Sequence, residues 1–71
     1  MVKVFSKPGC NGCTATKREM KKKGIEFAEL DITKDDGALE ELLSLGYQGV
    51  PVVVTPDDHW HGFKPEKIKA L

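Results

Sequence analysis

The feature that most constrains this chain is a pair of cysteines two residues apart, placed where an apolar segment gives way to a helical one. Cys10 and Cys13 are the only cysteines in the sequence. The segment Val2 to Phe5 ahead of them is short, apolar and partly β-branched, which predicts a strand, and Pro8-Gly9 ends it. A helix is predicted from Cys10 to Lys23. The two sulfurs are therefore expected at the start of a helix.

Length and charge narrow the class of protein. Seventy-one residues suffice for a single domain spanning 1–71. No apolar run approaches the ~20 residues of a membrane-spanning helix, and the segment Met1 to Phe5 is too short for a signal peptide. Eleven basic residues balance eleven acidic ones, so the net charge indicates neither a nucleic acid nor a membrane partner. We expect a monomeric cytoplasmic protein, in which thiols stay reduced and a disulfide is transient.

The middle of the chain alternates strand and helix. Glu26 to Ile32 predicts a second strand, parallel to the first through a right-handed crossover. Thr33 or Asp35 is expected to cap the next helix, which ends at Gly46. Three of its leucines recur at helical spacing and are expected in the core; they are Leu39, Leu42 and Leu43.

The last part of the chain predicts a hairpin and a short helix. The segment Val50 to Val54 ends in three consecutive valines, which are typical of a central strand buried on both faces, with Pro51 expected at the first residue of the strand. A turn leads to the short strand His59 to His61. Pro65 opens a final helix, with Ile68 and Leu71 facing inward. The expected fold is α/β, in the order β-α-β-α-β-β-α, with a four-stranded mixed sheet flanked by helices. A Cys-x-x-Cys pair beside a βαβ unit is typical of a thioredoxin-like redox motif.

The position of the cysteines predicts different reactivity for the two thiols. If Cys10 caps the helix, the free amides of Gly12 and Cys13 point at its sulfur. The helix dipole adds to this, so the pKa of Cys10 should fall below its usual ~8.5. Lys7 would add to the effect if it folds back. Cys10 is then the nucleophile that attacks a substrate disulfide, and Cys13 the thiol that resolves the mixed disulfide.

The cysteines fit a structural staple or a metal site less well than a redox pair. A Cys10–Cys13 bridge closes so small a ring that loop entropy predicts only ~2 kcal/mol of stabilisation. A zinc-binding or adaptor module could use both cysteines with His59 and His61, which share one face of a strand. The His-x-His spacing does not match the usual zinc-finger pattern. A solvated hairpin edge is the alternative for the two histidines.

Two features near the cysteines leave alternatives open. Gly12 costs a helix ~1 kcal/mol relative to alanine, so it either loosens the turn or lets the backbone of a partner approach. The Val50–Pro51 bond can be cis or trans. A cis bond would expose the backbone of Val50 beside Cys10, where an extended substrate could pair with it.

Three stretches, in order, carry a family resemblance. They are Lys7 to Lys17 with both cysteines, Val50 to Val53, and Trp60 to Ile68 with its Trp-x-Gly-Phe pattern. The Cys-x-x-Cys pair alone is moderately specific, but the three together are strong. Over essentially its whole length the chain resembles the thioredoxin superfamily, and more closely the glutaredoxin-like NrdH-redoxins.

The resemblance implies a thioredoxin fold and a dithiol-disulfide oxidoreductase without a cofactor. Proteins of this family deliver electrons to the large subunit of class Ib ribonucleotide reductase and are recharged by thioredoxin reductase. Val50 and Pro51 would form the substrate-facing loop. The remaining residues expected to bind a partner lie beside the cysteines or in the region that replaces the glutathione site; they are Lys7, Asn11, Gly12, Trp60, Phe63 and Lys64.

The chain also departs from the family pattern. Asn11-Gly12 is smaller than the usual spacer, His61 replaces a serine, and Lys64 replaces an arginine that can form forked hydrogen bonds. A glutathione-dependent glutaredoxin is the alternative function. Against it, the paired glycines and acidic residue of the usual glutathione site are absent after the hairpin. Trp60 and Phe63 have an alternative too, as apolar caps over the core.

Overall fold

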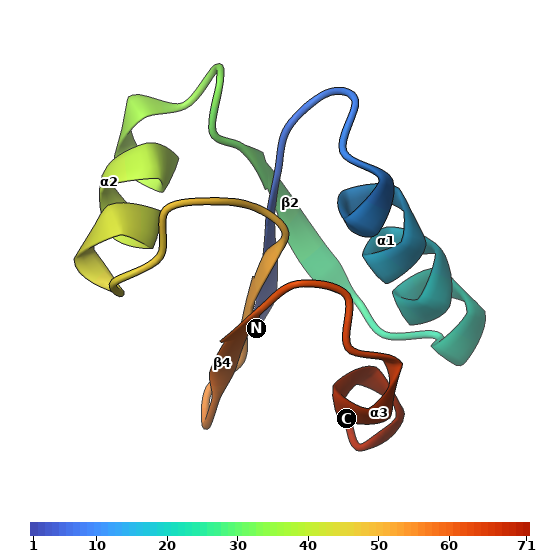
Figure 1. The fold of residues 1–71 in the computed structure, drawn as a ribbon. Helices are drawn as coiled ribbons and strands as arrows, with labels where there is room; N and C mark the ends of the chain where they lie inside the picture. Colours follow the sequence, from blue (N-terminus) through green and yellow to red (C-terminus); the bar gives the residue numbers. More distant parts are fainter.

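A computed structural model describes residues 1–71 and contains four strands and three helices (Figure 1). In chain order they are β1 (Val2–Ser6), α1 (Asn11–Lys23), β2 (Phe27–Asp31), α2 (Asp36–Ser44), β3 (Val52–Val54), β4 (His59–His61) and α3 (Pro65–Lys69). This confirms the predicted β-α-β-α-β-β-α order. None of the helices combines the length and the hydrophobicity needed to cross a bilayer.

The four strands form one mixed sheet in the order β2-β1-β3-β4. β1 and β2 run parallel, with Val4 opposite Glu29, as the right-handed crossover predicts. β3 is antiparallel to both β1 and β4, which confirms the expected hairpin. The helices α1 and α3 cover one face of the sheet and α2 covers the other (Figure 1).

Each face of the sheet has its own apolar cluster. Under α1 and α3 the cluster contains Val4, Met20, Val53, Trp60 and Ile68. Under α2 it contains Phe5, Ala38, Leu42 and Val52. The neighbouring valines Val52 and Val53 point to opposite faces and are both buried, because side chains alternate along a strand. The valine run therefore fits a central strand buried on both sides.

Three apolar side chains predicted to face inward do not do so. Leu39 and Leu43 are exposed, Leu43 by 51%, whereas Leu42 is 0% exposed. α2 has only nine residues and meets the sheet through one stripe, Ala38 and Leu42. Leu39 and Leu43 each follow that stripe by one residue, a rotation of about 100° around the helix. Leu71 is also exposed, because it lies beyond the last residue of α3.

The helix ends follow the expected local chemistry. Asp35 caps α2, its Oδ1 accepting from the amide of Ala38 at 3.0 Å. Thr33 is not the cap; its amide donates to Asp31 instead. α1 ends at Gly24, which has φ of 76°.

Candidate active site

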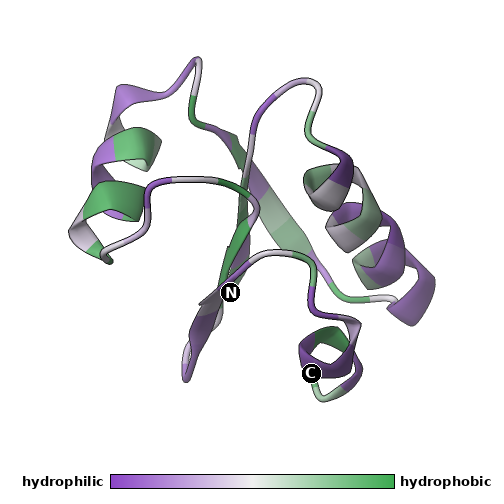
Figure 2. Ribbon diagram, in the orientation of Figure 1, coloured by the Kyte–Doolittle hydropathy of each residue, from purple (hydrophilic) through white to green (hydrophobic).

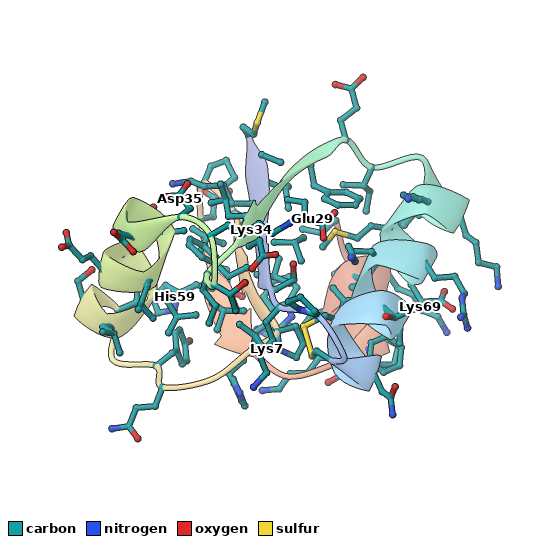
Figure 3. The ribbon with its side chains drawn as sticks, turned by 90° about the horizontal axis from the view of Figure 1, so that it is seen from above. Lys7, Glu29, Lys34, Asp35, His59 and Lys69 are labelled. Atoms are coloured by element: carbon teal, nitrogen blue, oxygen red, sulfur yellow. A yellow bond between two sulfur atoms is a disulfide. The ribbon has the colours of Figure 1, made fainter.

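The two cysteines form a disulfide at the start of α1 (Figure 3). Cys10 is the N-cap, with φ of −98° and ψ of 108°, and its Sγ accepts from the amide of Cys13 at 3.1 Å. The Cα atoms of the two residues lie 5.2 Å apart. This confirms the predicted cap. Cys10 is partly exposed while Cys13 is only 1% exposed, so an incoming disulfide can reach the first sulfur and not the second.

The first turn of α1 is held by two threonines that were not among the predicted site residues. Thr14 donates to the carbonyl of Cys10 twice, from its amide at 3.1 Å and from its hydroxyl at 3.2 Å. The buried hydroxyl of Thr16 donates to the carbonyl of Gly12 at 2.8 Å. A hydroxyl that bonds a carbonyl four residues earlier is a recognised pattern for threonine in helices. The four-residue spacing of Thr14 from Cys10 and of Thr16 from Gly12 could therefore have suggested both contacts.

Gly12 has a role that the sequence did not predict. A Cβ added at Gly12 would lie 3.1 Å from Cδ of Pro51 and 4.0 Å from Cβ of Phe63. The missing side chain therefore makes room for the chain's own proline. This contact joins the loop before β3 and the segment after β4 to the cysteine turn.

The contact between Gly12 and Pro51 places the loop before β3 next to the cysteine turn. Of the two isomers that the sequence allows for the Val50–Pro51 bond, the structure has the cis form. Pro51 is buried, and its carbonyl accepts from the amide of Gly62 at 2.8 Å. The backbone amide and carbonyl of Val50 make no hydrogen bond within the chain. An extended segment of another molecule can use these two groups.

The other predicted binding residues divide into an exposed group and a buried one. Lys7, Asn11 and Lys64 are exposed, and Phe63 is 41% exposed. Trp60 is only 4% exposed and packs in the cluster under α1 and α3. Its Nε1 has no hydrogen-bond partner. The structure therefore favours the core role over the contact role for Trp60, and leaves Phe63 at the surface.

A polar cluster that was not predicted from the sequence anchors the strand before the cysteine loop. Ser6 is buried, and its hydroxyl donates to Oε2 of Glu29 at 3.1 Å. The Lys17 ammonium reaches the same oxygen at 2.6 Å. The hydrogen bond from Lys17, aided by that from Ser6, holds the pKa of Glu29 below its usual value. Alternation along β1 places Ser6 on the α1 face, but the register with β2 was needed to find Glu29.

The two histidines lie on the exposed side of β4. The Tyr47 hydroxyl lies 2.7 Å from Nδ1 of His59, and the ring of Tyr47 stacks on His61 with centroids 6.1 Å apart. No three His, Cys, Asp or Glu side chains gather closely enough to hold a metal ion. The alternative zinc site made of both cysteines and both histidines is therefore wrong. The solvated hairpin edge describes the histidines correctly.

Comparison with known proteins gives a consistent result. The family model described as Glutaredoxin matches residues 2–60. The Glutaredoxin-like protein NrdH of Escherichia coli K12 is 33% identical over 70 residues, covering 99% of this chain and 86% of that protein. The Lactococcus lactis NrdH protein of strain MG1363 is 30% identical over 71 residues, covering 100% and 99% of the two chains.

A solved structure agrees with these sequence matches. The NrdH-redoxin of Escherichia coli superposes with a TM-score of 0.93 at 33% identity, covering 99% of this chain and 92% of that one. That protein is a glutaredoxin-like protein with a thioredoxin-like activity profile. The fold expected from the sequence, a mixed sheet in a thioredoxin-like arrangement, is thereby confirmed.

Proposed function

This chain belongs to the glutaredoxin family, among its NrdH-like members, and is a thiol-disulfide oxidoreductase; from that premise we propose that it delivers electrons to the large subunit of a class Ib ribonucleotide reductase. In the same proposal thioredoxin reductase recharges it in the cytoplasm, where it acts as a monomer of one domain. The observation that carries the proposal is Cys10 at the helix cap, accepting the amide of Cys13 on its sulfur.

The reaction starts from the dithiol form. The Cys10 thiolate attacks one sulfur of a substrate disulfide, forms a mixed disulfide and releases the other substrate sulfur as a thiolate, which takes up a proton. Cys13 then loses its proton and attacks Sγ of Cys10, which releases the second substrate thiol. Two electrons have passed to the substrate, and the protein is left with the Cys10–Cys13 bond seen in the structure. A reductase returns it to the dithiol.

The free backbone of Val50 is suited to hold the substrate during this exchange. An extended segment that pairs with the Val50 amide and carbonyl would run beside the cysteine turn. The residues that would border it are Lys7, Asn11, Gly12, Pro51, Phe63 and Lys64. The pairing uses backbone groups only, so it tolerates many substrate sequences.

Thioredoxin reductase is the favoured electron source for two reasons. The Escherichia coli NrdH-redoxin is described as thioredoxin-like in its activity profile. At the end of β4 and directly after it this chain carries His61, Gly62 and Phe63 in place of the paired glycines and acidic residue expected for glutathione.

A coupled assay tests both halves of the proposal. NADPH oxidation is followed with insulin or a class Ib reductase as acceptor, using either thioredoxin reductase or glutathione with its reductase. We expect turnover with thioredoxin reductase, and we expect the Cys10→Ser variant to lose it. Turnover only with glutathione would instead assign a glutathione-dependent glutaredoxin. Turnover with insulin but never with the ribonucleotide reductase would refute the proposed acceptor.

A further inference from the structure

Charge is divided unevenly between the two faces of the sheet, although it sums to zero over the chain. α1 carries five basic side chains and one acidic side chain. The segment Lys64 to Lys69, which contains α3, carries three basic side chains and one acidic side chain. On the opposite face the segment Thr33 to Leu45, which contains α2, carries four carboxylates and one lysine. Figure 2 shows strongly hydrophilic residues along the last turns of α1 and over α3. The balanced composition therefore conceals a basic face and an acidic one.

The basic face reaches the redox site along the outer side of α1. Exposed residues recur there every three or four positions, which places them on one stripe of the helix. They are Asn11, Thr14, Arg18, Lys21 and Lys22. We call this set the basic stripe. Its uncharged members Asn11 and Thr14 lie nearest Cys10, and its basic members begin at Arg18, about 12 Å from Cys10 along the helix axis. The first turn of α1 contains no acidic residue.

Internal contacts account for only some of these charges; within the stripe, Lys22 pairs with Glu19 at 3.9 Å. Lys17 and Lys23 are used within the fold, one bonding Glu29 and the other the carbonyls of Ile68 and Lys69. Arg18 and Lys21 form no ion pair and donate no side-chain hydrogen bond. A cation in the last turn complements the helix dipole, but Arg18 lies more than a turn from the end of α1. Unpaired like charges repel one another.

We propose that the basic stripe docks an acidic segment of the partner protein, adjacent to the disulfide that exchanges electrons with Cys10. The inference rests on the proposed function and adds the charge of the partner. An acidic segment is attracted to α1 and repelled by the carboxylates around α2. The segregated charge therefore turns the α1 side of the molecule, rather than the α2 side, toward an acidic partner in the encounter.

Three peptides test the proposed docking of an acidic segment. Each peptide contains the same pair of cysteines joined in a disulfide. Their flanking residues are acidic, neutral or basic, and the second-order rate of oxidation of the reduced protein is measured with each. At about 20 mM salt the acidic peptide is expected to react about tenfold faster than the neutral one. At about 0.5 M salt, where the Debye length is only a few Å, most of that advantage should disappear. Equal rates for the acidic and neutral peptides at low salt would overturn the proposal.

Two matched variants locate the effect. Arg18→Glu and Lys34→Glu each reverse one exposed, unpaired charge, on the basic stripe and on the α2 side respectively. Arg18→Glu should slow the acidic peptide about threefold or more at low salt, while Lys34→Glu has a much smaller effect. Equal effects from the two variants would overturn the proposal, as would a single-stranded oligonucleotide that binds the stripe more tightly than the acidic peptide.

A neutral substrate separates this inference from the proposed function. All forms of the protein should reduce 2-hydroxyethyl disulfide at the same rate, because it carries no charge to steer. Loss of that activity in the unmodified protein would contradict the oxidoreductase chemistry itself. Normal activity without charge dependence would contradict only the docking surface.

Discussion

At the scale of single residues, the site depends on two sulfurs in different surroundings. Cys10 is accessible and caps α1, whereas Cys13 is buried behind it. In the dithiol form the amide of Cys13 and the helix dipole would both favour a thiolate at Cys10. Neither helps Cys13, whose burial favours the neutral thiol.

Selective alkylation checks this difference. After reduction, iodoacetamide at about pH 7 should label Cys10 at least tenfold faster than Cys13, because the thiolate reacts and the buried thiol does not. Peptide mass spectrometry at short times gives the two rates, with a urea-unfolded sample as the control in which the rates converge. Equal labelling in the folded protein would contradict the assignment of roles.

Gly12 offers a second test at this scale. Gly12→Ala places a methyl group 3.1 Å from Cδ of Pro51, and Pro51 is buried and bonded through its carbonyl to Gly62. We expect the free energy of unfolding to fall by about 1 kcal/mol, because overpacking outweighs the ~1 kcal/mol gain in helix propensity. Urea denaturation measures it. A gain in stability would show that the proline loop moves freely.

At the scale of elements, α2 covers its face of the sheet through a narrow contact. Only Ala38 and Leu42 on this helix are buried. The Asp35 cap fixes where the helix begins, and the packing of the helix against the sheet decides which leucine is buried.

Two neighbouring leucines provide a matched comparison. Leu42→Ala should cost about 2–5 kcal/mol of unfolding free energy, since it empties a packed site. Leu43→Ala should cost less than about 1 kcal/mol, because Leu43 is half exposed. Both are measured by urea denaturation under the same conditions. Similar losses for the two variants would mean that Leu43 is covered in solution.

The elements also show what the sequence could and could not predict. Apolar runs, capping residues and turn residues act locally, so the order of elements and the cap at Cys10 could be read along the chain. The exposure of Leu43 and the burial of Trp60 depend on how the helices pack against the sheet, which no local pattern sets. The contact of Gly12 with Pro51, and the bonds from Ser6 and Lys17 to Glu29, join residues distant in sequence. These contacts could be found only from the strand register and the packing of the folded structure.

At the scale of the whole molecule, carboxylates with lowered pKa values set the response to acid. A hydrogen bond from Lys17 is the main cause of the lowered pKa of Glu29. In the same way, Thr33 lowers the pKa of Asp31, and Lys67 lowers the pKa of Asp58. A pKa below its unfolded value contributes stability above the unfolded pKa, and this contribution is lost as the pH falls through the folded pKa. The protein should therefore lose stability below about pH 4.5.

Glu29→Gln checks one of the three contributions to this response. The amide still accepts from Ser6 but has no charge for Lys17, so stability should change less between about pH 5 and pH 3 than in the unmodified protein. Thermal unfolding across that range measures the slope. Glu26→Gln is the control, since Glu26 forms no ion pair. An unchanged slope in Glu29→Gln would contradict the assignment.

The loop that presents the disulfide is tethered at both ends. On one side the Ser6 hydroxyl is bound to the neighbouring strand, and on the other the Cys10 carbonyl takes two hydrogen bonds from Thr14. Only three exposed residues, 7–9, lie between these anchors. We therefore expect the bond between the two sulfurs to form and break with motion of only a few atoms in this loop. Such a molecule can be oxidised and reduced many times without unfolding.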